Sequence, residues 1–342
     1  MNEIMVSVVM IAYNHERYIR KALESVVNQK TNFKFEIIIH DDASPDKTAD
    51  IIREYEKKYP EKIIAIYQKE NKYSKGENII EKYLYPLVKG KYYAYCECDD
   101  YWTDEYKLQK QVDFLEEHPE IVAVSHRYEI IDENNVQISL SHKNEVLNRF
   151  FDKEDALRLK SGLLHPSTIL YRANIIKDDR YLEGRKKCCI LGGHTFLIYY
   201  LLSKSDIYIM NDIMSVWRRA VEKNGTSYAS RSSIHPITYG NKLLDMYCRY
   251  REFFKKDYNF NSIIREMLLT QIKVIIVAIV IIIAGVSGYF IHDINTRFPK
   301  AVVEYYSKDN PLNINNLVIT PVESRVWTLD DFNEAYPNVL YQ

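Results

Sequence analysis

The chain has 342 residues, with 46 lysines and arginines against 47 aspartates and glutamates, and a formal net charge of -1. This balance excludes a general nucleic-acid binder, which carries a basic excess, so no nucleic-acid partner is expected. Hydrophobic residues make up 46% of the chain and glycine and proline only 10 residues each, which excludes disordered and collagen-like proteins. The five cysteines lack the paired C-x-x-C spacing of a zinc site and indicate free thiols in a reducing compartment.

The first 125 residues alternate between strand and helix patterns. Residues 6–12 are almost continuously apolar, which is typical of a strand buried on both faces, and Asn14 is expected to cap the helix that follows. Ser44 is expected to cap a second helix that has Pro45 at its first position and ends near residue 59. Further strands are predicted at 35–40, 63–67 and 92–96, and a third helix at 76–88. This order predicts an α/β fold with a doubly wound, mainly parallel sheet.

The pattern is looser beyond Pro119. The sequence predicts a strand at 121–126, a polar hairpin around 132–135, and helices at 153–159 and 191–202. It shows no internal repeat.

The strongest compositional break is at 274–291, where 18 residues carry no charge. A helix of that length would be about 27 Å long, close to the thickness of a bilayer core. We expect a single membrane span; a buried helix or a pair of strands is the alternative, because 275–283 is rich in β-branched residues. Glu3 stands where a signal peptide needs basic residues, so the N-terminal part is expected to be cytoplasmic and the protein membrane-associated.

These features divide the chain into four expected parts. They are an α/β domain at 1–230, a helical connector at 231–273, the span at 274–291, and a small C-terminal module at 292–342 whose role the sequence does not indicate.

Three polar clusters follow predicted strands, at 13–15, 41–42 and 97–100. Parallel sheets bind ligands outside the carboxyl ends of their strands, so these clusters predict a binding site. A single cluster of this kind also has a local explanation, since turns favour Asn and Asp.

The last cluster, Glu97-Cys98-Asp99-Asp100, brings carboxylates together where their repulsion calls for a cation. Mg²⁺ or Mn²⁺ fits such oxygen ligands and would neutralise a nucleotide diphosphate. The alternative is that these acids cap a helix beginning near Thr103. No glycine-rich phosphate loop is present, so a metal would have to hold the phosphates.

Four segments together resemble the nucleotide-sugar glycosyltransferases of family 2, over about residues 6–227. The segments are VSVVMIAYNHERYIRKALESVVNQ, EIIIHDDASPDKTADII, NKYSKGEN and CECDDYWTDEYKLQKQVDFL. The resemblance implies the GT-A fold and a reaction that inverts the anomeric centre.

The resemblance also implies roles for residues in the first three segments. Ala12, Tyr13 and Asp42 would hold the nucleotide base, and Asp41 and Ser44 would shape the turn. The matching residues of the third segment would lie near the donor: Asn71, Tyr73, Ser74, Gly76 and Asn78.

In the acidic segment, the resemblance implies that Asp99 is the metal ligand, with Glu97 in place of the commoner aspartate, and that Asp100 contacts the ribose or the sugar. Mn²⁺ or Mg²⁺ is the implied cofactor. Arg218 matches an arginine near the donor diphosphate, where a guanidinium makes bidentate phosphate contacts; an ordinary surface ion pair is the alternative.

The family's catalytic base is usually an aspartate at the start of a helix. The matching residue here is His194, which can accept a proton near neutral pH. If the match is displaced, Asp178 or Asp179 would supply the base. His165 lies on the segment that faces the acceptor in such folds, although a lone histidine is more often structural.

These expectations describe an inverting, metal-dependent glycosyltransferase of the hexosyltransferase type. It would move a sugar from a nucleotide diphosphate, such as a UDP-sugar, to a hydroxyl of a glycan or lipid-linked acceptor in surface polysaccharide synthesis. Two alternatives stay open. One is a catalytically silent nucleotide-sugar-binding scaffold at the membrane, suggested by His194. The other is a nucleotidyltransferase, which usually has the glycine-rich loop that is missing here.

Overall fold

A computed structural model describes residues 3–141, 148–159, 164–191, 193–219 and 236–270. They belong to two compact units, one within Met1–Ala220 and the other within Val221–Gln342. The first unit contains the sheet and every candidate site residue. The described part of the second unit is helical, with α8 (Pro236–Phe253) followed by a helical stretch at 261–270.

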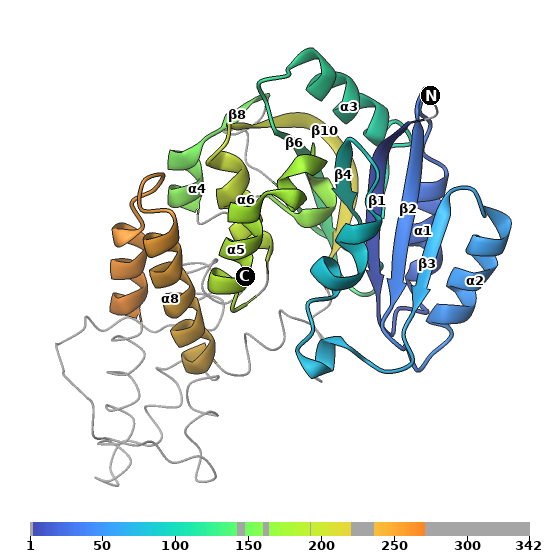
Figure 1. The fold of residues 1–342 in the computed structure, drawn as a ribbon, viewed down its shortest axis with the longest axis horizontal. Helices are drawn as coiled ribbons and strands as arrows, with labels where there is room; N and C mark the ends of the chain where they lie inside the picture. Colours follow the sequence, from blue (N-terminus) through green and yellow to red (C-terminus); the bar gives the residue numbers. More distant parts are fainter. Residues whose placement is uncertain (1–2, 142–147, 160–163, 192, 220–235, 271–342) are drawn as a thin grey trace, which may run out of the picture. The chain divides into compact units, whose positions relative to one another are not determined.

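The core of the first unit is a set of four parallel strands. They are β1 (Ile4–Ala12), β2 (Lys34–Asp41), β3 (Ile63–Tyr67) and β4 (Tyr92–Tyr95), in the spatial order β3-β2-β1-β4 (Figure 1). β1 and β2 are buried along almost their whole length, as their apolar runs predict. The order reverses between β1 and β4, and α/β sheets bind ligands at such a switch point.

Beyond β4 the strands pair in both directions, so the described sheet as a whole is mixed. β4 pairs antiparallel with β9, β9 antiparallel with β6, and β6 parallel with β10. β5 and β8 pair antiparallel with β10, and β7 pairs antiparallel with β6. The expected parallel arrangement therefore holds for the first four strands only. The added strands are β5 (Tyr101–Trp102), β6 (Ala123–Ile131), β7 (Gln137–Leu140), β8 (Arg149–Phe151), β9 (Leu170–Arg172) and β10 (Ile207–Arg218).

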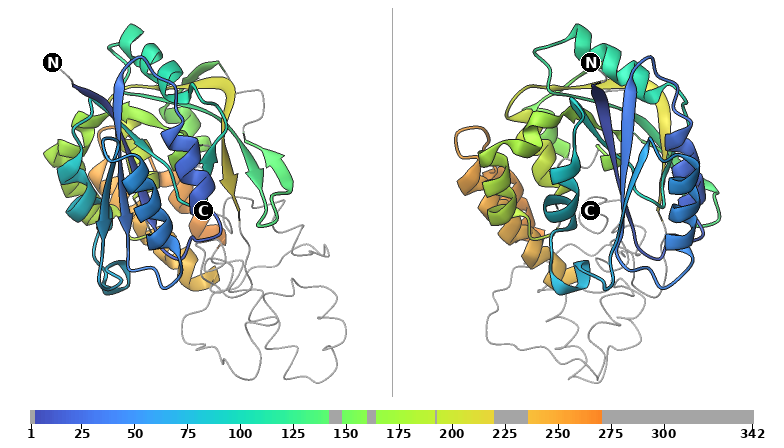
Figure 2. Two further views of the ribbon diagram at one scale, coloured as in Figure 1. Left: turned by 90° about the vertical axis from the view of Figure 1, so that its right-hand side faces the viewer. Right: turned by 45° about the vertical axis from the view of Figure 1, so that its right-hand side comes forward.

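Helices cover both faces of this sheet. Figure 2 shows α1 and α2 on one face, and α5 and α6 on the other. The helices of the first unit are α1 (Ile19–Val27), α2 (Thr48–Lys58), α3 (Lys107–Glu117), α4 (Lys153–Leu159), α5 (Asp179–Cys188) and α6 (His194–Leu202). The buried face of α1 consists of the five apolar positions whose spacing predicted it.

Both expected helix caps are wrong. α1 begins after Tyr18, and Asn14 lies in the preceding loop with a φ of 59°, a left-handed conformation that asparagine tolerates. α2 begins at Thr48, whose backbone N–H donates to Asp46 Oδ1 at 3.0 Å, so Ser44 and Pro45 lie in the loop. In both places the helix begins several residues after the expected capping residue, so the loop between strand and helix is longer than predicted.

The helix expected at 76–88 is not one regular α-helix. A 3₁₀ turn at Tyr73–Lys75 precedes this range, and within it lie a π-helical turn at Ile80–Leu84 and a second 3₁₀ turn at Tyr85–Leu87. Gly76, with a φ of 77°, ends the first turn in the left-handed region. Pro86 lacks a backbone N–H, so a regular helix through this segment would lose a hydrogen bond.

Later predictions fare better. α4 has the expected bounds, and the hairpin joins β6 to β7 through a turn that begins at Asp132. β6 continues to Ile131, beyond the expected end at residue 126. α6 begins at His194, inside the expected range.

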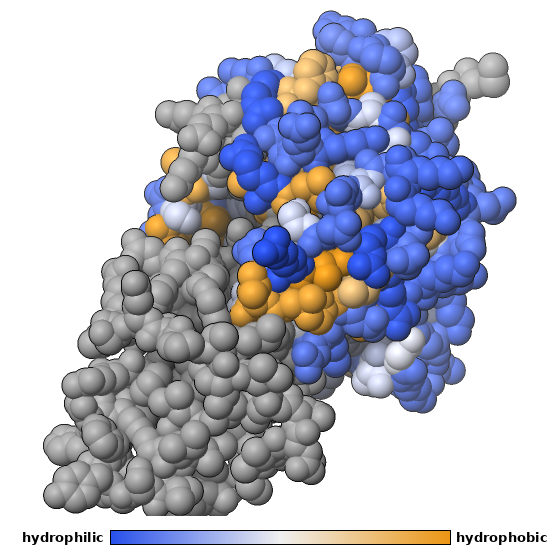
Figure 3. All heavy atoms as spheres, turned by 90° about the vertical axis from the view of Figure 1, so that its left-hand side faces the viewer, coloured by the Kyte–Doolittle hydropathy of each residue, from blue (hydrophilic) through white to orange (hydrophobic). Residues whose placement is uncertain are grey.

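Apolar side chains are mostly inside and polar ones outside. One face of the molecule shows a largely hydrophilic surface over the described residues, with hydrophobic residues gathered in limited patches (Figure 3). On the hairpin strand β7, Ile138 is 51% exposed and Leu140 42% exposed.

The expected membrane span at 274–291 lies outside the described residues, as does the module at 292–342. Within the part of the chain that the structure describes, none of the helices combines the length and the apolar character needed to cross a bilayer.

Candidate nucleotide and cation site

The three polar clusters lie at one edge of the sheet. β1 pairs with β2 on one side, with Ala12 opposite Asp41, and with β4 on the other, where the Cys96 N–H donates to the Val9 carbonyl at 3.0 Å. The chain therefore leaves these three neighbouring strands at the same end. This edge contains two groups of residues, one around Asp41 and Asp42 and one around the acidic segment 97–100.

Hydrogen bonds join the loops after β1 and β2. The Asp42 N–H donates to the Ala12 carbonyl at 3.0 Å, and the Asn14 N–H donates to Ser44 Oγ at 3.0 Å. Ala43 has a φ of 60°, so the second loop turns sharply. Ser44 thus shapes this turn, the role that the resemblance implies for it.

A third loop is held by Asp42. Its Oδ1 accepts the Lys72 N–H at 2.8 Å, and its Oδ2 accepts the Tyr73 N–H at 3.0 Å. Within this loop Asn71 Oδ1 accepts the Ser74 N–H at 2.6 Å, and Gly76 ends the turn. Both oxygens of the buried Asp42 carboxylate therefore position the segment that the sequence predicted to lie near the donor. The last residue of that segment, Asn78, accepts the Glu81 N–H at 3.3 Å.

Asp41 has a different environment from Asp42. Its Oδ2 accepts the Ser44 N–H at 3.3 Å, whereas its Oδ1 is buried without a hydrogen-bond partner among the described residues. An unpaired buried acceptor is costly, which makes it a place where a ligand can supply a donor. Tyr13, next to the buried Ala12, is 45% exposed and offers an aromatic face at this edge.

Asp100 anchors the acidic segment. The carboxylate is buried; Oδ1 accepts the Arg218 N–H at 2.8 Å and Oδ2 accepts the Ser167 hydroxyl at 2.9 Å. The expected alternative, in which these acids cap a helix near Thr103, is wrong because α3 begins at Lys107. Asp100 instead ties together three segments that are distant in sequence.

Glu97 and Asp99 are less constrained. The Glu97 side chain is 37% exposed, and its Oε2 lies 3.3 Å from His165 Nε2. The Asp99 carboxylate makes no hydrogen bond or ion pair with any residue that the structure describes, while its backbone carbonyl accepts from Arg218 Nε at 3.1 Å. These two carboxylates therefore remain available for a cation.

The electrostatics of the segment favour a cation. Partial desolvation and then repulsion from Asp99 raise the pKa of Glu97 above its ordinary value. Burial, followed by repulsion from Asp99 and Glu97, raises the pKa of Asp100 well above the ordinary range. Oxygen ligands of this kind suit Mg²⁺ and Mn²⁺, so the donor set fits the expected metal.

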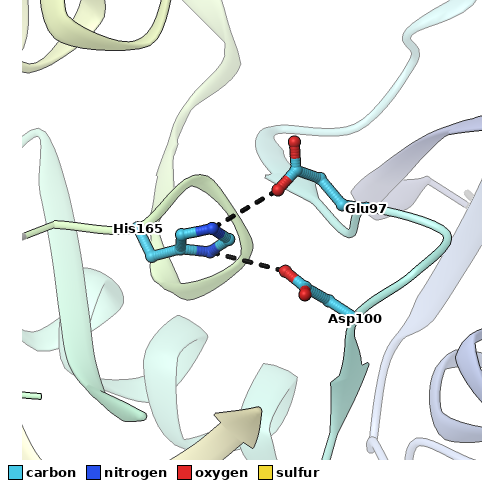
Figure 4. A group of neighbouring side chains, drawn as sticks. All are labelled: Glu97, Asp100 and His165. Carbon is cyan, nitrogen blue, oxygen red and sulfur yellow. Dashed lines mark ion pairs between the residues drawn. The ribbon is translucent and has the colours of Figure 1, made fainter. Parts of the chain in front are cut away.

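His165 lies between two of these acids (Figure 4). The Glu97, Asp100 and His165 side chains each present a ligand atom within 4.8 Å of the others. The sequence paired Glu97 with Asp99 and placed His165 on the acceptor side, so this grouping was not expected. Burial, followed by the nearby His194, lowers the pKa of His165 well below its ordinary value.

Arg218 makes its contacts within the protein. Its guanidinium donates to the Asp99 carbonyl at 3.1 Å, to the Asp132 carbonyl at 3.1 Å and to Asn135 Oδ1 at 2.9 Å. It also lies 4.5 Å from the centre of the Tyr18 ring. The arginine thus braces the acidic segment against the β6–β7 hairpin, and it is not an ordinary surface ion pair.

His194 is the first residue of α6, as the resemblance implies for a base. Its Nε2 contacts the Leu164 carbonyl, so Nε2 carries the proton of the neutral ring and Nδ1 is the acceptor. Nδ1 is buried without a partner among the described residues, and burial lowers the pKa of His194 to about 4. The contact with Leu164 places His194 beside the segment that carries His165.

The alternative base Asp178 caps α5. Its side chain accepts the Arg180 N–H at 2.9 Å and pairs with Lys204 Nζ at 3.0 Å.

Ser167 was missed as a site residue, since nothing local in the sequence connects it with Asp100. The antiparallel pairing of β4 with β9 brings the two segments together.

The family model for glycosyl transferase family 2 matches residues 7–180, slightly more than half of the chain. The chain belongs to this family. The residues described above at the ends of β1, β2 and β4, together with His165 and Ser167, lie within the matched range. Arg218 and His194 lie beyond it.

Known proteins are similar in sequence to part of this family 2 member. It is 34% identical over 226 residues to an uncharacterized protein of Mycobacterium tuberculosis, covering 62% of this chain and 58% of that protein. It is 34% identical over 250 residues to the minor teichoic acid biosynthesis protein GgaB of Bacillus subtilis, covering 70% of this chain and 26% of GgaB. The chain thus spans less than two thirds of the length of either protein.

A solved structure shares the fold. The crystal structure of residues 1–349 of S. aureus TarS in complex with UDP aligns with a TM-score of 0.53 at 16% identity, covering 78% of this chain and 71% of that one. This likeness, together with the mixed α/β sheet, is consistent with the GT-A fold.

Proposed function

We propose that this family 2 member transfers a sugar from a nucleotide diphosphate, with UDP as the nucleotide, to a hydroxyl group and inverts the anomeric centre. The observation that carries the proposal lies at one sheet edge. There the buried Asp41 Oδ1, which has no partner in the described part of the chain, is brought together with the available carboxylates of Glu97 and Asp99. An acceptor for a base N–H and ligands for a diphosphate-bound cation are what such a donor requires. The complex of TarS with UDP supports the choice of nucleotide.

In this proposal the nucleotide lies along the loops after β1 and β2. Tyr13 gives the base an aromatic face, and Asp41 accepts its N–H, while Asp42 holds the loop at 71–76 in place. Ala12 closes the floor of the site, since it is fully buried. Asp100 positions the acidic segment rather than contacting the sugar.

Glu97 and Asp99 would hold Mn²⁺ or Mg²⁺. When bound, such a cation supplies positive charge next to the diphosphate and makes it a better leaving group. Arg218 keeps the Asp99 backbone in place, and the phosphates are not assigned to its guanidinium, which already has three acceptors within the protein.

His194 is the proposed general base. With its proton on Nε2, the ring presents Nδ1 as the atom that takes the proton of the acceptor hydroxyl. A lowered pKa keeps the ring neutral at pH 7, which is the form that accepts a proton.

The acceptor in this proposal is a glycan or lipid-linked saccharide of a surface polysaccharide. Relatedness to GgaB, a teichoic acid biosynthesis protein, supports this class. A span at 274–291 would keep a cytoplasmic catalytic domain at 1–230 beside such acceptors, with 231–273 as the connector.

Calorimetric titration of the full-length chain with UDP, with and without Mn²⁺, tests the donor site. We expect binding that requires Mn²⁺ and is lost in Asp99→Ala. Asp113→Ala, which removes an exposed carboxylate on α3, is the matched control and should bind as the wild type does. Absence of UDP binding in both conditions would contradict the proposal.

A second candidate is a donor-binding protein without turnover. It is favoured by His194 standing where relatives use an aspartate, with a pKa of about 4 that makes it a weak base. Mn²⁺-dependent UDP binding combined with no release of UDP from any UDP-sugar, with or without acceptor, would support this candidate. Release of UDP that His194→Gln abolishes without weakening UDP binding would support the enzyme.

A further inference from the structure

The His165 ring is fixed in one orientation between two acids. Nε2 lies 3.3 Å from Glu97 Oε2, and Nδ1 lies 3.5 Å from Asp100 Oδ2 (Figure 4). The side chain is only 11% exposed, and its ring centre lies 5.1 Å from Trp217 and 5.6 Å from Tyr128. Packing against two aromatic rings leaves little freedom to rotate, so each ring nitrogen keeps its own neighbour.

Ser167 determines which ring nitrogen carries the proton. The Ser167 N–H donates to His165 Nδ1 at 3.4 Å, and the Ser167 hydroxyl donates to Asp100 Oδ2 at 2.9 Å. Nδ1 and Asp100 Oδ2 are therefore both acceptors, each served by a donor of Ser167. An Nδ1 that accepts a hydrogen bond carries no proton, so the ring proton of His165 is on Nε2.

It follows that a donor points at Glu97. The Nε2–H of His165 faces Glu97 Oε2, whereas the other carboxylate oxygen, Oε1, makes no hydrogen bond or ion pair with the residues that the structure describes and lies on a side chain that is 37% exposed. A nitrogen that carries a proton has no lone pair for a metal, so His165 itself is a poor ligand. Its contact with Glu97 is instead the arrangement by which outer residues orient metal-binding carboxylates.

We propose that His165 is a positioning residue that holds Glu97 so that its second carboxylate oxygen faces the cation of the nucleotide diphosphate. The inference rests on the proposed donor site and extends it. Ser167 connects this support to Asp100, so the orientation of Glu97 is set by a segment that lies 68 residues away in the chain. Removing such a partner costs about 10-fold to 100-fold in metal affinity.

Two substitutions of His165 separate its contact with the Ser167 N–H from its contact with Glu97. In His165→Asn the side-chain oxygen can accept the Ser167 N–H, since asparagine is among the best residues for this capping position, but the amide is too short to reach Glu97. In His165→Gln the longer amide brings an N–H donor to the place of Nε2. The binding of Mn²⁺ alone and of Mn²⁺ with UDP is then measured on the full-length chain, by calorimetry and by the electron paramagnetic resonance of free Mn²⁺.

We expect His165→Asn to weaken Mn²⁺ binding about 10-fold or more, and His165→Gln to bind close to the wild-type affinity. Both variants should melt close to the wild-type temperature, because the capping contact or the packing is retained. Equal weakening by both variants would indicate that the ring nitrogen is itself a ligand and would overturn the proposal. Unchanged Mn²⁺ binding in His165→Asn would overturn it too.

A double-mutant cycle with Glu97→Gln tests whether His165 acts through Glu97. In the Glu97→Gln background, His165→Asn should weaken Mn²⁺ binding no further, and full additivity would contradict the proposal. If the wild type binds neither Mn²⁺ nor UDP, the proposed function fails and this inference fails with it. If the wild type binds both and the cycle is additive, only this inference fails.

Discussion

Asp41 and Asp42 are neighbours in the chain, yet their carboxylates have different partners. Asp42 uses both oxygens to accept the backbone N–H groups of Lys72 and Tyr73, whereas one oxygen of Asp41 has no partner among the residues that the structure describes. The sequence predicts that both residues lie at the site because both follow a buried strand. It does not show which one is committed to the fold, because the loop at 71–76 is distant in sequence.

Replacing Asp42 should therefore release that loop. Asp42→Ala removes the acceptor of two N–H groups, and we expect a loss of about 1–3 kcal/mol in unfolding free energy together with weaker UDP binding. Hydrogen exchange at the Lys72 and Tyr73 amides measures the release directly. Asp50→Ala, at a side chain that is 76% exposed, is the control and should leave these amides protected. Unchanged exchange in Asp42→Ala would contradict the assignment.

Lys107 is a buried lysine at the first position of α3. It is fully buried, its Nζ donates to Gln111 Oε1 at 2.7 Å, and it lies 4.1 Å from the centre of the Trp102 ring. Burial lowers the pKa of Lys107 from 10.5 to about 7. Between these two values the unfolded chain binds a proton that the folded chain does not, so this group makes unfolding free energy rise with pH.

The slope should approach about 1.4 kcal/mol per pH unit in that window and vanish below pH 7, where both states are protonated. Urea unfolding at pH 7.5 and 9.0 measures it. In Lys107→Met the rise attributable to this group should disappear, so the two proteins differ more at pH 7.5 than at pH 9.0. Lys110→Met, at a partly exposed neighbour, should keep the wild-type pH dependence. Identical pH dependence in Lys107→Met and the wild type would contradict the assigned burial effect.

At the scale of elements, periodicity predicts most of the first unit, and its failures have local causes. The apolar runs of β1 and β2 and the helical spacing of α1 are confirmed, because burial on two faces or one leaves a clear pattern. The segment at 76–88 also has apolar residues at helical intervals. There, a left-handed Gly76 and the missing N–H of Pro86 divide it into short turns.

Two glycines test this reading of backbone geometry. A Cβ on Gly90 would meet backbone atoms of the adjacent strand, including the Ser7 nitrogen and, at 2.7 Å, the Val6 carbonyl carbon. A Cβ on Gly76 would meet no atom within 4 Å, so the cost of a substitution there comes only from the φ of 77°, which L-residues with a side chain rarely adopt. Backbone atoms cannot rotate away as side chains do, so the two substitutions to alanine should differ strongly in cost.

We expect Gly90→Ala to lower unfolding free energy by about 3 kcal/mol or more, because it separates β4 from β1. Gly76→Ala should cost about 1 kcal/mol, the price of a left-handed alanine. Chemical denaturation of both variants measures the difference, and UDP binding reports whether the edge of β4 has moved. Equal losses would show that the close approach at Gly90 relaxes without cost.

At the scale of the whole molecule, strand order makes the site. The spatial order β3-β2-β1-β4 places the ends of β1, β2 and β4 together. From the alternation of strand and helix, the sequence predicts a parallel sheet with its binding site at the strand ends, but not this order. The antiparallel strands that follow have no such signal. For this reason the support of the acidic segment by Ser167, and the grouping of His165 with Glu97, became visible only in the structure.

The segment at 274–291 carries the last prediction, that the full-length chain is anchored in a membrane. A charged residue at the centre of a span costs about 2.5–3.5 kcal/mol, so Ile282→Lys combined with Val286→Lys should prevent stable insertion. We expect the wild-type chain to stay with the membranes after alkaline carbonate extraction and the double variant to be released. Val136→Lys combined with Ile138→Lys adds the same charge at exposed positions of the first unit and should remain with the membranes.

Release of the wild type by carbonate would contradict the anchor. The segment would then be core, as its β-branched residues also permit, and the two lysines would be placed in a packed interior. In that case Ile282→Lys with Val286→Lys would lower the melting temperature of an extractable protein and leave its partition unchanged. Partition and melting temperature together therefore distinguish a span from a buried element, because a lysine pair weakens insertion in the first and packing in the second.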